Sequence, residues 1–179
     1  MTILAVTVIM PFAGHAAAQG VSTPSLKAAF LLNFVKFTQW PDDLLPARAP
    51  LSLCILGDND VAKSLEELIK GQSVDGHDFS VKRISADGAT RACHLVYISR
   101  IGAKESMALV QSLQNAPALT VSDRSGFAQS GGILNFIFEN DRMRFAINIE
   151  AAHRAGLRLS SKLLSLADIV KDPSNPSQP

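Results

Sequence analysis

Short apolar segments alternate with amphipathic ones along most of this chain, and this alternation restricts the fold more than any other feature. Three of the apolar segments show no strict alternation of apolar and polar residues, which is typical of strands covered on both faces. They are Leu51–Leu56, His94–Ser99 and Ala118–Ser122. Strands that alternate with helices predict an α/β fold with a mostly parallel sheet and helices on both faces.

The remaining elements follow from the spacing of apolar residues. Leu26, Phe30, Phe34 and Phe37 lie three or four positions apart, which predicts a largely buried opening helix that runs to Trp40. A chain of 179 residues suits one domain, since domains take roughly 100–200 residues. The other predicted elements are helices at Val61–Lys70, Lys104–Asn115, Ala151–Ala155 and Ser161–Ile169, an edge strand at Phe79–Ile84, and a C-terminal β-hairpin of Ile133–Phe138 and Met143–Ile149.

Composition excludes several classes of protein. The chain is 47% hydrophobic and 18% charged, a balance that favours a folded core over disorder. Its 17 Lys and Arg residues against 16 Asp and Glu give a net charge of +1, which argues against a nucleic-acid partner. With only two cysteines, the chain can be neither a disulfide-rich miniprotein nor a four-thiolate zinc protein.

The two ends of the chain differ from the folded domain predicted over residues 22–170. The apolar run Ile3–Phe12 is too short to span a bilayer, which takes roughly 20 residues, and Ala16–Ala18 follow it. This order predicts a cleavable signal peptide over residues 1–18 and export of the mature chain. The alternative is a buried N-terminal strand, which would have no need of the alanine cluster. Residues 171–179 are rich in Pro and Ser and predict a disordered tail.

No motif of a known catalytic or cofactor site is found in the sequence. HExxH, GxSxG, GxxxxGK[ST] and GxGxxG are all absent. The four histidines lack metal-ligand spacing. We therefore predict a protein that is not an enzyme and that has neither a cofactor nor a metal site.

The segment Ser122–Gly132 is the best candidate for a ligand crevice. It follows a buried strand, at the position where open α/β sheets bind their ligands. Arg124, Ser125 and Gly126 could receive an anion there. The alternative interpretation is a tight connection into the hairpin. One candidate function is therefore that of a small-molecule-binding protein that acts as a sensor input domain.

Three basic residues near the C-terminus form a second candidate site. Arg154, Arg158 and Lys162 could dock an acidic partner, although Gly156 interrupts the helical spacing of the first two. A solvated surface is the alternative interpretation.

Cys54 and Cys93 are the two cysteines of the chain. One lies in a predicted buried strand and the other directly precedes a second one. If those strands are neighbours, the two residues come within disulfide range, and export would favour the bond. Two buried thiols are the alternative.

The sequence also resembles the YfiR family of exported bacterial proteins. The similarity is carried by LKAAFLLNFVKFTQWP, LSLCILGDNDV, CHLVYIS and GGILNFIFENDRMRFAINIEAAHRAGLRLSSKLLSLA, and it spans Leu26 to Ala167. Cys54 and Cys93 match cysteine positions of some members. A second pair, found near the hairpin in some members, is absent here, where Asn135 and Arg142 occupy that stretch.

This resemblance implies a non-enzymatic periplasmic regulator that tends to form a homodimer. Such a protein binds the periplasmic sensor domain of an inner-membrane diguanylate cyclase and represses it, which lowers cyclic di-GMP and biofilm formation. An outer-membrane lipoprotein can sequester the regulator and release the cyclase. Redox control that depends on the second cysteine pair is not expected in this chain.

Overall fold

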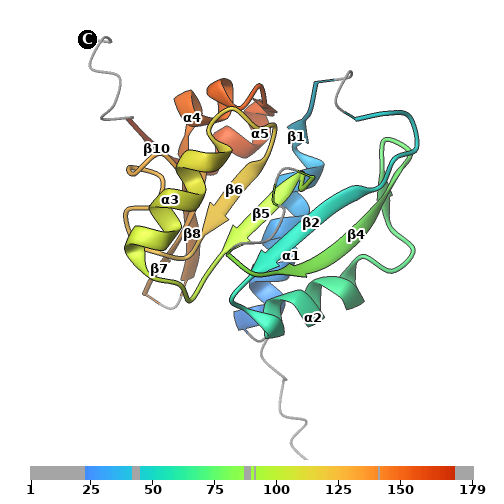
Figure 1. Ribbon diagram of the computed structural model, residues 1–179, viewed down its shortest axis with the longest axis horizontal. Helices are drawn as coiled ribbons and strands as arrows, with labels where there is room; N and C mark the ends of the chain where they lie inside the picture. The colour runs from blue at the N-terminus through green and yellow to red at the C-terminus, as the bar shows by residue number, and fades with distance from the viewer. Residues whose placement is uncertain (1–22, 42–44, 87–89, 91, 141, 172–179) are drawn as a thin grey trace, which may run out of the picture.

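Among the residues that the computed structural model describes, eight strands form one mixed sheet and two further short strands form a separate pair (Figure 1). The structure describes residues 23–41, 45–86, 90, 92–140 and 142–171. The predicted signal peptide and all of the predicted tail except Lys171 lie outside these residues. The strands are β1 (Thr38–Gln39), β2 (Leu51–Leu56), β3 (Ser73–Val74), β4 (His77–Ile84), β5 (Leu95–Ile98), β6 (Leu119–Ser122), β7 (Leu134–Glu139), β8 (Arg142–Asn148), β9 (Arg158–Leu159) and β10 (Asp168–Val170).

The large sheet has the order β10-β8-β7-β6-β5-β2-β4-β3. Strands β4, β2, β5, β6 and β7 run parallel to their neighbours in this row, and β8 is antiparallel to β7. Every residue of β2, β5 and β6 is buried, as their apolar sequences predicted. The predicted α/β domain with a mostly parallel sheet is confirmed.

Helices cover both faces of the sheet. Helix α1 (Thr23–Lys36) lies behind it in Figure 1 and α3 (Ala103–Leu113) lies in front, while α2 (Asn59–Leu68) packs into the same core as α1. Successive residues of a strand point to opposite faces. Leu53 and Ile55 accordingly join the core under α1 and α2, whereas Leu56 joins a second cluster under α3. No helix in the described residues is long and apolar enough to cross a membrane.

Phenylalanine rings join α1 to the hairpin. The ring of Phe34 lies 5.0 Å from that of Phe145 and 5.6 Å from that of Phe136, measured between centroids. Phe30 packs against the same two rings at 5.9 and 6.0 Å. Phe34 is only 1% exposed. The predicted apolar stripe of the opening helix therefore holds two distant parts of the chain together.

The opening helix ends earlier than its apolar spacing predicted. It stops at Lys36, and the Thr38 hydroxyl donates a hydrogen bond of 2.7 Å to the Phe34 carbonyl. The following strand β1 pairs antiparallel with β9, so this part of the chain leaves the helix to make strand hydrogen bonds. The prediction of a helix as far as Trp40 was therefore wrong in its last turn.

The predicted helix Ser161–Ile169 is also shorter in the structure. Helix α5 (Ser161–Leu164) ends after one turn, and β10 follows it and pairs parallel with β8. An unpaired strand edge leaves backbone N–H and C=O groups without partners. Strand β10 satisfies those of β8, and Arg144 forms an ion pair with Asp168 across the two strands at 2.5 Å. The hairpin and α4 (Ile149–Arg154), in contrast, lie close to where we predicted them.

Strand β4 was predicted at an edge of the sheet, and it is the last long strand on that side. The two-residue strand β3 pairs antiparallel with its beginning and forms the true edge. The turn between them takes left-handed backbone at Asp75 and Gly76. Most of the alternating, half-polar strand therefore borders β2 on one side only, which accounts for its sequence pattern.

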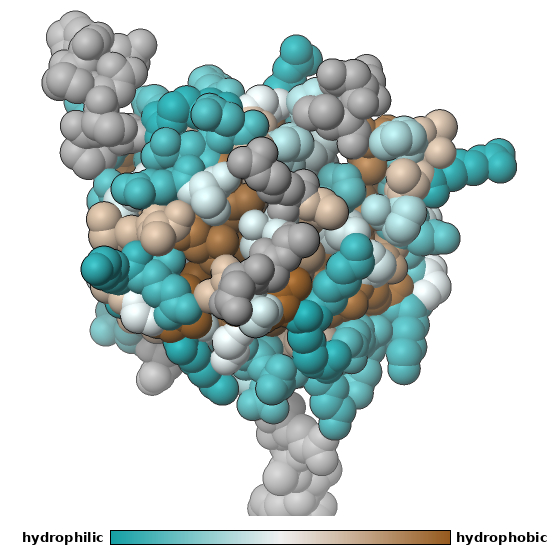
Figure 2. All heavy atoms as spheres, in the orientation of Figure 1, coloured by the Kyte–Doolittle hydropathy of each residue, from teal (hydrophilic) through white to brown (hydrophobic). Residues whose placement is uncertain are grey.

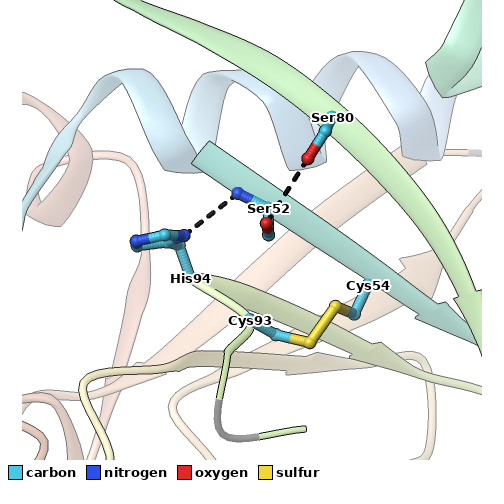
Figure 3. Close-up of a disulfide and its surroundings, with 5 residues drawn as sticks. All are labelled: Ser52, Cys54, Ser80, Cys93 and His94. Carbon is cyan, nitrogen blue, oxygen red and sulfur yellow. Dashed lines mark hydrogen bonds between the residues drawn. A yellow bond between two sulfur atoms is a disulfide. The ribbon is translucent and has the colours of Figure 1, made fainter. Parts of the chain in front are cut away.

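Cys54 and Cys93 are joined by a disulfide bond, shown in Figure 3. Their Cα atoms lie 5.9 Å apart, because β2 and β5 are neighbouring parallel strands. Beside the bond, the Ser52 N–H donates to His94 Nδ1 at 3.0 Å, which requires an unprotonated nitrogen there (Figure 3). Desolvation by burial, with smaller contributions from the charges of His77 and Lys82, lowers the pKa of His94. The imidazole is thereby kept in the form that accepts this bond.

Removing the disulfide should destabilise the fold. The bond closes a loop with a sequence separation of 39 residues. Replacing both cysteines with alanine should lower the free energy of unfolding by about 3–4 kcal/mol, because the unfolded chain regains loop entropy. Urea unfolding of oxidised wild type, reduced wild type and the double variant is the measurement. We expect the last two to agree, and intact-mass analysis should find the oxidised chain lighter by two hydrogen atoms.

Truncating Phe34 tests the ring cluster. Phe34→Ala should cost about 3–5 kcal/mol of unfolding free energy, since a large buried side chain leaves a cavity. Phe138→Ala is the matched control, because that ring is 50% exposed, and it should cost less than about 1 kcal/mol. Equal effects of the two substitutions in thermal unfolding would contradict the packing described here.

Candidate functional site

A crevice lies at the carboxyl ends of β5 and β6, beside the first turn of α3. One hollow there, of about 270 Å³, includes Ser99, Ser106 and Arg124 in its wall. The chain packs tightly beneath it, because a Cβ on Gly57 would lie 1.9 Å from the Ser99 carbonyl oxygen. The left-handed backbone of this residue, with φ +83°, also favours glycine. This edge of an open α/β sheet is the usual place for a ligand.

The crevice continues into a second, more apolar hollow of about 180 Å³ along α3. Ser106, Arg124 and Ser125 line both hollows, which are therefore adjacent. Met107 and Phe127 contribute apolar surface to the second one. Met107 is 49% exposed.

Two of the three predicted crevice residues, Arg124 and Ser125, line both hollows, and Gly126 follows them in the chain without lining either one. The Arg124 backbone N–H donates to Ser122 Oγ at 3.1 Å, and its guanidinium donates to the Ile101 carbonyl oxygen on the opposite wall. Ser125 is exposed, and Gly126 has left-handed backbone with φ +76°. The segment is thus both a tight connection into the hairpin and one wall of a crevice.

Asn135 on β7 holds this segment in place. Its side-chain amide donates to the carbonyl oxygens of Arg124 at 2.8 Å and Ser122 at 3.2 Å. Its side-chain oxygen accepts from the Phe127 N–H at 3.0 Å. In the sequence, Asn135 is distinguished only by its place in the stretch that lacks the second cysteine pair. Its use as a hydrogen-bonding centre was missed, because its partners become neighbours only when β6 and β7 pair.

A buried charged cluster that no sequence pattern predicted underlies the crevice. Lys27 Nζ of α1 contacts Asp123 Oδ2 at 2.5 Å. The same carboxylate accepts hydrogen bonds from Tyr97 at 3.0 Å and from Ser99 at 3.0 Å. Asp123 immediately precedes Arg124, so the cluster and the crevice share one stretch of chain. A lysine in the apolar opening helix was the only signal that could have indicated it.

Asp58 extends this cluster toward α2. Its carboxylate lies 4.0 Å from Lys27 Nζ and 3.5 Å from the Arg100 guanidinium. It also accepts a hydrogen bond from the Val61 N–H and so caps α2. The two carboxylates and two cations of the cluster therefore balance.

These contacts shift two pKa values. Burial alone would raise the pKa of Asp123, but hydrogen bonding and charge attraction from Lys27, with the hydroxyls of Tyr97 and Ser99, lower it overall. Burial and the charge of Asp123 raise the pKa of Tyr97 far above its ordinary value. At neutral pH the carboxylate is charged and the phenol is a hydrogen-bond donor, so each stabilises the other.

The three predicted basic residues near the C-terminus are all exposed, but they lie on different elements. Arg154 is on α4, Arg158 on β9 and Lys162 on α5. The left-handed backbone of Gly156, with φ +71°, turns the chain between the first two. The Lys162 ammonium lies 5.4 Å above the Phe37 ring, where it makes a cation–π contact.

Arg154 and Arg158 border separate hollows. Arg154 lines a shallow one with the C-terminal part of α3. Arg158 lines a cavity of about 470 Å³ at the amino end of β2, together with Trp40 and His77. This cavity lies at the opposite end of β2 from the crevice. The structure therefore does not bring Arg154 and Arg158 together on a common helix face.

No group of three or more His, Cys, Asp and Glu side chains that could hold a metal ion is found among the described residues. His77 bonds through Nδ1 to the Ala49 carbonyl oxygen at 2.8 Å. The ring of His94 lies against that of Trp40, with centroids 6.0 Å apart. His77 and His94 therefore each make contacts that hold neighbouring parts of the fold together.

Comparison with known proteins identifies the relatives of this fold. Residues 24–168 match the YfiR/HmsC-like family. The chain belongs to this family. YfiR/HmsC-like proteins are periplasmic, non-catalytic regulators in cyclic di-GMP signalling. The match covers the large sheet up to the first residue of β10, so the crevice and all three basic residues lie within it.

A crystal structure of a conserved domain protein from Vibrio cholerae O1 biovar El Tor has the same fold. It is 11% identical to this YfiR/HmsC-like chain, with a TM-score of 0.54, and the match covers 84% of the chain and 60% of the other protein. The chain thus spans about three-fifths of that protein.

Replacing Lys27 tests the buried cluster. Lys27→Met should lower the unfolding free energy near neutral pH by about 1.5–3 kcal/mol, the contribution of a hydrogen bond to a charged group. The folded-state pKa of Asp123 lies below its unfolded value, so the stabilisation is present above about pH 4 and is lost as the pH falls through the folded pKa. Wild type and variant should therefore converge in acid.

Lys36→Met provides the control for this measurement. Lys36 is on the same helix but exposed, and its Nζ donates to the Gln72 side chain at 2.7 Å. Its loss should change stability by less than about 0.5 kcal/mol. Urea unfolding across the acid range would contradict the pairing of Lys27 with Asp123 if the difference between wild type and Lys27→Met were independent of pH.

Proposed function

We propose that this protein binds the periplasmic sensor domain of an inner-membrane diguanylate cyclase and represses the enzyme. The observation that supports the proposal is the YfiR/HmsC-like match over residues 24–168, which includes almost every element of the described domain. Repression lowers cyclic di-GMP and with it biofilm formation. The proposal also includes export by the N-terminal segment, which brings the domain to the compartment of its target.

The contact surface that we propose includes Arg154 and Arg158, with a smaller contribution from Lys162. All three side chains are exposed, while Ala151, Leu157 and Leu163 anchor the same stretch of chain in the core. These three apolar side chains hold the stretch against the domain. Lys162 contributes less because its ammonium already contacts the Phe37 ring. Exposed charges of this kind mainly accelerate the encounter with a partner of opposite charge.

Repression requires that the protein distinguish two states of its target. A ligand shifts a conformational equilibrium only by its difference in affinity for the two states. The sensor domain must therefore present its acidic contact surface differently when the cyclase is active and when it is inactive. An outer-membrane lipoprotein that competes for the regulator would release the cyclase, and a homodimer would present the contact surface twice.

Charge reversal tests the contact surface. Arg154→Glu and Arg158→Glu, made singly and together, should weaken binding of the isolated sensor domain, mostly through slower association that depends on salt. Surface plasmon resonance at several salt concentrations is the measurement. Lys63→Glu, an exposed residue of α2, is the matched control and should leave binding unchanged. Circular dichroism verifies that each variant is folded.

Cellular cyclic di-GMP tests the function itself. Deleting the gene should raise cyclic di-GMP, and wild-type protein supplied from a plasmid should restore the low level. The double arginine variant should restore it incompletely. An unchanged level after deletion would refute repression, whereas full restoration by the folded double variant would refute only the contact surface.

A further inference from the structure

The crevice beside α3 combines features of an anion site with an apolar flank, and neither the family nor the proposed repression assigns it a ligand. Helix α3 has 11 residues and begins after Gly102, which offers no side-chain hydrogen bond to the first turn. Backbone N–H groups at the start of a helix lack partners within the helix and favour negative charge. The first turn of α3 therefore presents donors that no capping side chain satisfies.

A second observation at the same place is the hydroxyl of Ser106. The residue is 2% exposed and lines both hollows of the crevice. Among the described residues its hydroxyl has no hydrogen-bond partner. The wall of the crevice therefore offers a hydroxyl that can donate a hydrogen bond to a ligand atom.

Arg124 supplies a positive charge at the crevice. Its guanidinium reaches the Ile101 carbonyl oxygen and forms no ion pair with any carboxylate in the described part of the chain. The nearest acidic residue in sequence, Asp123, is already neutralised by Lys27 and by two hydroxyl donors. A guanidinium has five N–H groups, so Arg124 keeps donors for a ligand.

The apolar part of the crevice restricts the ligand further. Met107 is 49% exposed at its rim, and Phe127 lines its wall. Figure 2 shows hydrophobic residues in the middle of the face that bears α3, with hydrophilic residues around them. We propose that the crevice binds a small carboxylate with an apolar substituent, with its carboxylate near Ser106 and Arg124 and its substituent along Met107 and Phe127.

An NMR titration of the ¹⁵N-labelled chain with phenylacetate tests this site. Phenylacetate should shift the amide signals of Ser106, Arg124 and Ser125. Phenylacetamide lacks the charge and acetate lacks the ring, so both should bind at least about tenfold more weakly. Equal binding of phenylacetamide would overturn the anion site, as would shifts centred on the cavity of Trp40 and His77 or no shifts at all.

Substitutions assign the roles of the two side chains. Arg124→Met should weaken phenylacetate binding about ten- to a hundredfold, and Ser106→Ala about two- to tenfold. Arg83→Met, an exposed arginine paired with Glu66 on another part of the surface, is the control and should have no effect. If Arg124→Met fails to fold, the proposal is tested by Ser106→Ala and by the comparison of phenylacetate, phenylacetamide and acetate on wild type. Unchanged affinity in folded variants would overturn the proposal.

Discussion

The central strands β2, β5 and β6 have no side that faces water, and the arrangement of the whole domain follows from this constraint. Residues on one face of these strands pack under α1 and α2, and those on the other face pack under α3. In a parallel sheet both faces are covered, because the helices that connect the strands lie on those faces. The disulfide lies in the α3 cluster, where Cys54 is fully buried. It therefore links β2 to the start of β5 on the side that has a single helix.

The charged cluster and the crevice both lie at the carboxyl ends of the central strands. Lys27 reaches this end of the sheet from an otherwise apolar helix, and it is stable there because Asp123 and Asp58 both approach it. Breaking such a pair leaves a buried charge without a partner. Because Asp123 is occupied by this cluster, the neighbouring Arg124 remains available to the crevice. The positive charge of Arg124 at the crevice therefore depends on the pairing of Asp123 with Lys27 in the buried cluster.

The domain has two separate regions that could bind a ligand or a partner. The crevice lies at the carboxyl ends of the strands, whereas Arg158 borders a cavity at the amino end of β2. Asn135 holds the crevice loop to β7, and β7 pairs with β8, whose last residue caps α4. One hydrogen-bonded path therefore connects the ligand crevice that we propose to the segment that carries the basic residues. A ligand at one end could bias the other only if it binds two conformations of this path with different affinities.

Local patterns in the sequence determined the longer strands, most of the helices and the fold class. They left the pairing of Cys54 with Cys93 open, because that bond requires β2 and β5 to be neighbours in the sheet. Apolar runs and helical spacing are properties of neighbouring residues, so they can be read along the chain. The same patterns failed at Thr38 and at Asp168, where pairing with a distant strand outweighed the local preference for helix.

The candidate sites depended on contacts between residues far apart in the chain. The sequence indicated the loop with Arg124, but not that Lys27 would neutralise Asp123 across 96 positions or that Asn135 would hold the loop. In the sequence, Arg154 and Arg158 are four residues apart, and this spacing does not decide whether they share a helix face. The left-handed turn at Gly156 shows that they do not. Local sequence determines which elements form, because hydrogen bonds and burial within an element involve nearby residues. Only the packed structure decides which polar groups meet, because the burial of one requires a partner that another element supplies.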